Sequence, residues 1–122
     1  MISKDTLGFL KDLEQNNDRD WFLANKGRFE TAKADFTDFV AFMIGKIYDF
    51  DSVATSVLPQ DCVFRIYRDV RFSKNKNPYK DHFGAYIGPG GRKSASPGYY
   101  FHLQPGKSFI AGGKYSRIRA SC

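Results

Sequence analysis

One segment, residues 64–80, holds most of the side chains in this sequence that could do chemistry. It has a single carboxylate, Asp69, and six cationic side chains: Arg65, Arg68, Arg71, Lys74, Lys76 and Lys80. Its net charge is therefore +5. Two like charges about 6.6 Å apart on one strand face repel by about 2.5 kcal/mol at an effective dielectric of about 20. Such a concentration needs a counterweight, which could be water and salt, acidic residues elsewhere in the chain, or a bound anion.

Phosphate is a suitable anion, because guanidinium groups bind it as forks and lysines bind it as point charges. We therefore predict a ligand-binding surface on this segment, made of Arg65, Arg68, Arg71, Ser73, Lys74, Lys76, Tyr79 and Lys80. Aromatic side chains between the cations could stack on nucleic-acid bases. Phe64 and Phe72, however, alternate with the charged face and are expected in the core.

Two side chains could move a proton. Asp69 would share a strand face with Arg65 and Arg71, so it could be an ion-pair partner or a general base. Arg68 lies on the opposite face and is expected to pair with an acid of the N-terminal helices, such as Asp18 or Asp20. His82 could be a proton shuttle near neutral pH or an ordinary loop histidine.

The two cysteines do not suggest a metal or redox site. Cys62 and Cys122 have neither CxxC spacing nor a histidine cluster nearby, so we predict no disulfide framework, no metal and no cofactor. Cys62 is interpreted as a small core residue.

Helices are predicted in the first half of the chain. Ser3 can cap a helix over residues 4–15, in which apolar side chains recur every three to four positions. Asp18 can cap a second helical region, and the apolar spacing then continues to Ile47. This second region is a long amphipathic helix that could be broken near Gly27.

Strands are predicted in the second half. Residues 64–72 alternate between apolar and polar, which indicates a strand, although Val63, Ile66, Tyr67 and Val70 also fit one helical face. A loop follows over residues 73–81. Three short strands are then predicted at residues 83–87, 99–103 and 108–111, with turns at residues 88–91 and 105–106. The order predicts an α+β domain, in which the N-terminal helices pack on an antiparallel sheet formed by the C-terminal half.

Charge is divided unevenly between the halves of a chain whose 122 residues suit one domain. Residues 1–61 carry a net charge of −4, and residues 62–122 carry +10. Either the halves face each other, or the basic half presents a field to an acidic partner. The longest apolar run, residues 39–44, is too short to span a membrane, and no secretory signal follows Met1, so a cytoplasmic protein is expected.

Four motifs occur in order along the chain: Asn16 to Phe22, Phe64 to Lys74, Pro78 to Lys80, and Gly98 to Leu103. Together they resemble the domain of unknown function 2461 family, a group of mainly bacterial proteins. The resemblance implies the fold group and no activity. Family members continue into helical sequence after a Gly-Gly turn, whereas here Gly112-Gly113 leads into a different tail. We therefore expect the N-terminal part of a longer domain, whose uncovered sheet edge near Phe109 and Ile110 could permit self-association.

Three functions remain open. The chain could bind an anionic, phosphate-bearing ligand or nucleic acid through residues 64–80. It could be an enzyme on a phosphate- or carboxylate-bearing substrate, with Asp69 or His82 moving a proton. It could also be a structural domain, whose arginines and Asp69 form a buried salt-bridge network.

Overall fold

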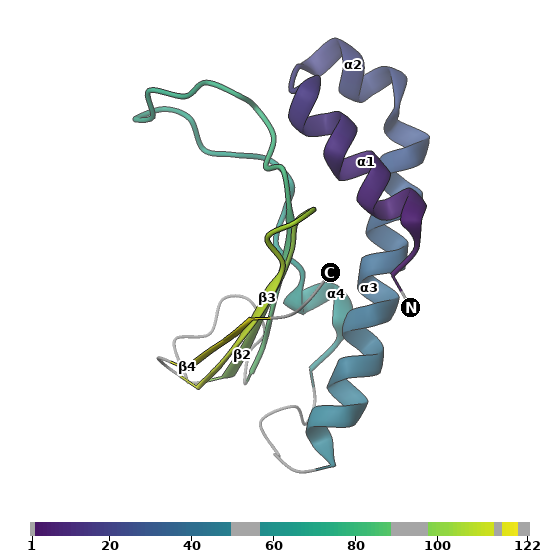
Figure 1. The fold of residues 1–122 in the computed structure, drawn as a ribbon, viewed down its shortest axis with the longest axis vertical. Coiled ribbons are helices and arrows are strands. Elements are labelled where there is room, and N and C mark those ends of the chain that lie inside the picture. The colour runs from purple at the N-terminus through teal and green to yellow at the C-terminus, as the bar shows by residue number, and fades with distance from the viewer. Residues whose placement is uncertain (1, 50–56, 89–97, 114–115, 120–122) are drawn as a thin grey trace.

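A computed structural model describes residues 2–49, 57–88, 98–113 and 116–119. In order, the helices are α1 (Lys4–Gln15), α2 (Arg19–Ala24), α3 (Lys26–Tyr48) and α4 (Pro59–Cys62). The strands are β1 (Phe83–Ile87), β2 (Gly98–Leu103), β3 (Phe109–Gly113) and β4 (Ser116–Arg119). Figure 1 shows the helices as one layer and the sheet as the other, so the predicted α+β fold is confirmed.

The two predicted helix caps are present. The Ser3 hydroxyl accepts from the Thr6 N–H at 3.2 Å, and α1 covers the predicted residues 4–15. The Asp18 carboxylate accepts from the Trp21 N–H at 2.8 Å and starts α2. The break expected near Gly27 lies at Asn25, whose side chain and backbone N–H groups both donate to the Trp21 carbonyl. The short helix α4 was not predicted.

The sheet is antiparallel with strand order β1-β2-β3-β4. The first three strands are the three short runs that the sequence predicted, whereas β4 was not predicted. The turn at Pro105-Gly106 is also confirmed, because Gly106 has φ +76° and the Lys107 N–H donates to the Gln104 carbonyl. Most of the other predicted turn, residues 88–91, lies outside the described residues.

The core lies between the sheet and α3. Phe83 of β1 stacks on Phe36 of α3, with centroids 5.4 Å apart, and Phe101 of β2 meets Phe39 edge-on at 5.9 Å. Cys62 is fully buried in this core, as predicted. Strand side chains alternate in direction, so the sheet face that carries Tyr100, His102 and Phe109 points away from the core. None of the helices among the described residues is long and apolar enough to cross a membrane.

The strand predicted over residues 64–72 is wrong. Of this segment, the structure pairs only Tyr67 in an isolated bridge, and Phe72 is 95% exposed rather than in the core. The reason is local hydrogen bonding, which competes with a strand ladder. The Asp69 carboxylate accepts from the Arg71 N–H at 3.2 Å, and the Ser73 N–H donates to the Val70 carbonyl at 3.3 Å, so the chain turns.

Gly98 offers a test of the sheet register. A Cβ at Gly98 would overlap the carbonyl oxygen of Ile87, a backbone atom that cannot move aside without disturbing β1. We expect Gly98→Ala to destabilise the fold by about 1–3 kcal/mol. The control is Gly45→Ala in α3, where a Cβ meets nothing and should stabilise the helix by about 0.5–1 kcal/mol. Equal urea midpoints for both variants would contradict the register.

Candidate functional site

Residues 64–80, which we call the basic loop, leave the sheet and return to it as one closed excursion (Figure 1). Two backbone hydrogen bonds close its base. The Lys80 N–H donates to the Ile66 carbonyl at 2.7 Å, and the Arg68 N–H donates to the Pro78 carbonyl at 3.0 Å. Ile66 is buried. The loop is therefore attached by its base and carries its tip away from the core.

Asn17 and Phe22 fasten this base to the helices. The side-chain amide of Asn17 donates to the Tyr79 carbonyl at 2.8 Å and accepts from the Tyr79 N–H at 3.1 Å. The buried Tyr79 ring stacks on Phe22, with centroids 4.1 Å apart and an interplanar angle of 13°. This anchor was not predicted, because Asn17 lies 62 residues from Tyr79 and no local pattern links them. Tyr79, a predicted ligand residue, is thus a structural anchor.

Arg68 organises the interior of the loop. Its guanidinium donates to the carbonyls of Asn75 at 3.3 Å and Asn77 at 2.9 Å, and to the Ser73 hydroxyl at 3.4 Å. The expected pairing of Arg68 with an acid of the N-terminal helices is wrong. That expectation assumed a strand, whereas the turn brings loop carbonyls within reach of the guanidinium. Arg68 and Ser73 therefore hold the loop in shape.

The tip holds an exposed ion pair. The Arg71 guanidinium donates to both carboxylate oxygens of Asp69, at 2.9 and 3.1 Å, and this hydrogen bonding lowers the pKa of Asp69. Both side chains are more than half exposed, so the pair adds little stability. The ammonium of Lys76 donates to the Val70 carbonyl at 2.5 Å, and Lys74 is exposed. The buried salt-bridge network considered above is therefore not formed by Asp69 and Arg71.

Two aromatic rings on the loop face solvent beside cations. Phe72 is 95% exposed and Tyr67 is 50% exposed. The Arg71 guanidinium lies 5.8 Å from the Phe72 ring, and the Arg65 guanidinium lies 5.4 Å from the Tyr67 ring. Each such pair is a weak cation–π contact at the surface. The loop thus presents flat apolar rings and positive charge together.

A stack of rings lies on the outer sheet face. The imidazole of His82 stacks on that of His102 at 4.1 Å, and His102 stacks on Phe109 at 4.7 Å. His102 pairs with Gly84 in the β1–β2 register, and that register brings it beside His82. His82 was predicted as a candidate and His102 was not, because their proximity depends on that register.

Hydrogen bonds fix the tautomer of His102. Its Nε2 lies 2.8 Å from the side-chain oxygen of Gln104, which can only accept, so Nε2 carries the proton. In that tautomer Nδ1 is the acceptor for the Tyr100 hydroxyl, 3.0 Å away. Burial raises the pKa of that Tyr100 hydroxyl, so it stays a donor. Hydrogen bonds on both ring nitrogens therefore orient the His102 imidazole, which stacks on that of His82.

The hydrogen bonding of His82 differs from that of His102. Its Nδ1 lies 3.3 Å from the Asp81 carboxylate, which places the proton on Nδ1 and leaves a lone pair on Nε2 of the neutral ring. Burial, followed by the neighbouring His102, lowers the pKa of His82 below its usual 6.5 despite the carboxylate. The ring is therefore mainly neutral at pH 7.

A polar cavity of about 220 Å³ lies between the basic loop and the start of β1. It is lined by Asn17, Arg68, Asn75, Asn77, Tyr79, Lys80, Asp81 and His82. Of the ten predicted site residues, the structure brings Arg68, Tyr79, Lys80 and His82 together here. Arg71 and Lys74 lie at the tip with Asp69 instead.

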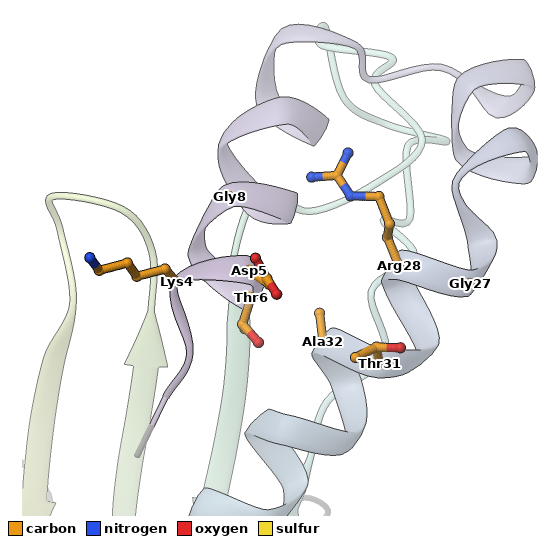
Figure 2. A pocket seen from close by; sticks show the side chains of 8 residues that line it. All are labelled: Lys4, Asp5, Thr6, Gly8, Gly27, Arg28, Thr31 and Ala32. Carbon is orange, nitrogen blue, oxygen red and sulfur yellow. The ribbon is translucent and has the colours of Figure 1, made fainter.

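Figure 2 shows a different cavity, of about 360 Å³, between α1 and the start of α3. Arg28 extends from α3 toward α1, whereas Lys4 points away from the gap. The Arg28 guanidinium already donates to the Asp12 carboxylate at 2.8 Å. None of the predicted site residues lines this cavity, so it is not the candidate site. Among the described residues, no three histidine, cysteine or acidic side chains gather into a group that could hold a metal.

These features define a two-layer α+β domain with a projecting basic loop anchored on its helical layer. The family model described as "Conserved hypothetical protein (DUF2461)" matches residues 5–121. The chain therefore belongs to the DUF2461 family, and the resemblance seen in the four motifs is confirmed. Neither the search of curated proteins nor the search of solved structures gave a match.

Replacing Asn17 should show how much the anchor contributes. Asn17→Ala removes both partners of the Tyr79 backbone, and we expect a loss of about 1–3 kcal/mol in the free energy of unfolding. Asn16→Ala is the matched control, because the Asn16 amide donates only to the exposed Asp12 carbonyl, and its cost should stay within about 0.5 kcal/mol. Urea unfolding measures both. A neutral Asn17→Ala would mean that the loop is not anchored here.

His82 should make the fold sensitive to mild acid. Because its pKa is lowered on folding, the unfolded chain takes up this proton first as the pH falls below 6.5. The free energy of unfolding must then decline. Above that pH the ring is neutral in both states and contributes nothing. His82→Asn should flatten the decline between about pH 7 and pH 5, measured by urea unfolding at each pH. An unchanged slope would show that His82 titrates normally.

Proposed function

We propose that this chain binds single-stranded nucleic acid through the basic loop. One observation carries the proposal: Phe72, a large apolar ring, stands 95% exposed at the tip of a loop rich in cations. A ring in water loses the stabilisation of burial, about 1.5–3 kcal/mol for such a side chain. A partner that covers it recovers this free energy.

The chemistry around Phe72 identifies the partner class. The exposed Arg71 guanidinium lies beside the ring, with part of its charge offset by Asp69, and exposed Lys74 follows two residues later in the chain. An uncharged apolar partner would offer no anion to these cations, although Asp69 pairs with Arg71. A nucleic-acid strand offers both complements, since its phosphates match the cations and its bases match the rings.

Single strands fit better than duplexes. In a duplex the base faces are already stacked on one another, so Phe72 and Tyr67 would find no free face. In a single strand each unstacked base offers a face, and stacking on an aromatic side chain contributes about 1–3 kcal/mol per base.

The loop is also held in shape before any ligand arrives. Arg68 bonds Asn75 and Asn77, and the Ser73 hydroxyl accepts from the Asn75 N–H at 3.2 Å. The loop therefore needs little ordering on binding, which lowers the entropic cost. This is how the predicted ligand residues Arg68 and Ser73 contribute: they shape the surface that the tip presents.

Salt and one aromatic substitution test the proposal. If three to five cations of the loop meet phosphates, log affinity for an oligothymidine should fall against log salt with a slope of about −2 to −3.5. Phe72→Ala should weaken binding about five- to hundredfold, the loss of one stacked base. Fluorescence anisotropy measures both.

Phe42→Ala is the matched control, because Phe42 is also exposed and also lies near a cation, Lys46, but sits on α3. It should leave the affinity unchanged. Binding that ignores salt, or that falls equally in both variants, would exclude recognition by the loop.

A further inference from the structure

We infer that the cavity beneath the basic loop is a second binding site, which takes the terminal phosphomonoester of a bound strand. Lys80 and Arg68 would hold its oxygens, and Nε2 of His82 would share its proton. This inference rests on the proposed function, because the strand at the tip delivers its end to the cavity.

The size of the cavity favours a small group. Ligand pockets for drug-sized molecules measure about 300–1,000 Å³, whereas this cavity measures about 220 Å³. Its described lining is polar, with amide side chains from Asn17, Asn75 and Asn77. A base or a sugar ring would desolvate these amides, whereas phosphate oxygens accept hydrogen bonds from them.

Lys80 supplies the charge. Its side chain is partly buried, and its ammonium lies 5.6 Å from the Phe64 ring. Among the described residues, no carboxylate lies within ion-pair distance of it. Burial, and then the charge of Arg65, lower the pKa of Lys80 below its usual 10.5. An anion beside this ammonium would relieve both effects, because it offsets the lost hydration and screens Arg65.

Arg68 adds donors. A guanidinium has five N–H groups, and the three hydrogen bonds of Arg68 to the loop leave at least two of them for a ligand. The one carboxylate in the described lining, Asp81, is engaged by Nδ1 of His82. The cavity therefore offers a net positive charge to an anion even when His82 is neutral.

His82 explains why a terminal phosphate should be preferred to an internal one. A phosphomonoester has a second pKa of about 6, so near neutral pH it exchanges a proton that an internal phosphodiester does not carry. As the monoanion it can donate this proton to Nε2 of neutral His82. As the dianion it can accept a hydrogen bond from Nε2 of protonated His82. Either state forms the same contact, and the groups that face the ring are Lys80, Asp81 and His102.

The test compares three versions of one oligothymidine of about twelve nucleotides. The first carries a 5′-phosphate, the second a 3′-phosphate, and the third has hydroxyl groups at both ends. We expect one phosphorylated strand to bind the parent protein about tenfold or more tightly than the hydroxyl strand. Lys80→Met and His82→Asn should each remove this difference. His82→Asn keeps a donor that can reach Asp81, but it removes the Nε2 contact together with the ring that stacks on His102.

Lys46→Met is the matched control, since the Lys46 ammonium lies 5.3 Å from a Phe42 ring on α3, as Lys80 lies over Phe64. It should keep the tenfold difference. The comparison within the parent protein needs no variant, so a variant that fails to fold cannot obscure the result.

Equal binding of all three strands would overturn the inference and leave the proposed function standing. A tenfold difference that survives in Lys80→Met and His82→Asn would overturn it as well. If only a phosphorylated strand binds, the result would support phosphate binding in the cavity and would contradict strand binding by the tip of the loop. Failure of every strand to bind would overturn both proposals.

Discussion

The paired hydrogen bonds between the Asn17 amide and the Tyr79 backbone fix the position of everything that we assign to the site. They hold the base of a long loop against the junction of α1 and α2, where the Phe22 ring also covers Tyr79. A side-chain amide can replace one residue of a strand partner, because it offers a donor and an acceptor in the same plane. The base of the loop is thus fixed to the helical layer as well as to β1, where the Phe64 N–H donates to the Gly84 carbonyl.

From that base outward, the loop satisfies its own polar groups. The Arg68 guanidinium donates to the carbonyls of Asn75 and Asn77, as the N–H groups of a neighbouring strand would in a sheet. Without it, these carbonyls would face solvent or a ligand. This changes how the charge of the segment should be counted. Two of the six cations, Arg68 and Lys76, are engaged with the loop itself, and a third, Arg71, is partly neutralised by Asp69. The remaining cations, at the tip and at the base, set the field that a partner meets.

The elements that were predicted correctly are those whose signals are local. Residues 4–15 form a helix because Ser3 caps it and its apolar residues share one face, and both features can be read within one short window. Residues 64–72 were predicted wrongly although their alternation was regular. The alternation describes side chains, whereas the Asp69 carboxylate bonding to the Arg71 N–H decides where the backbone goes. To predict this turn from the sequence, one would have had to rely on an aspartate two residues before an arginine, which is a weak signal.

The sequence indicates which types of residue line the candidate site, but it does not indicate how they are arranged in space. All six predicted cations lie on one loop, yet several contacts that shape the site join distant segments. His82 meets His102 through the register of β1 with β2, and Tyr79 meets Asn17 across 62 residues. Sequence spacing within one segment carries no information on either contact.

Burial then divides the cations of the loop between two physical roles. A unit charge 4 Å from a phosphate contributes about 1 kcal/mol in bulk water and about 4 kcal/mol at an effective dielectric of about 20. Exposed Lys74 and Arg71 are close to the first limit, so their attraction is broad, screened by salt and indifferent to the position of the phosphate. Partly buried Lys80 is closer to the second, so its attraction depends on where an oxygen sits. The tip is therefore suited to attracting a strand, and the cavity at the base is suited to distinguishing one phosphate from another.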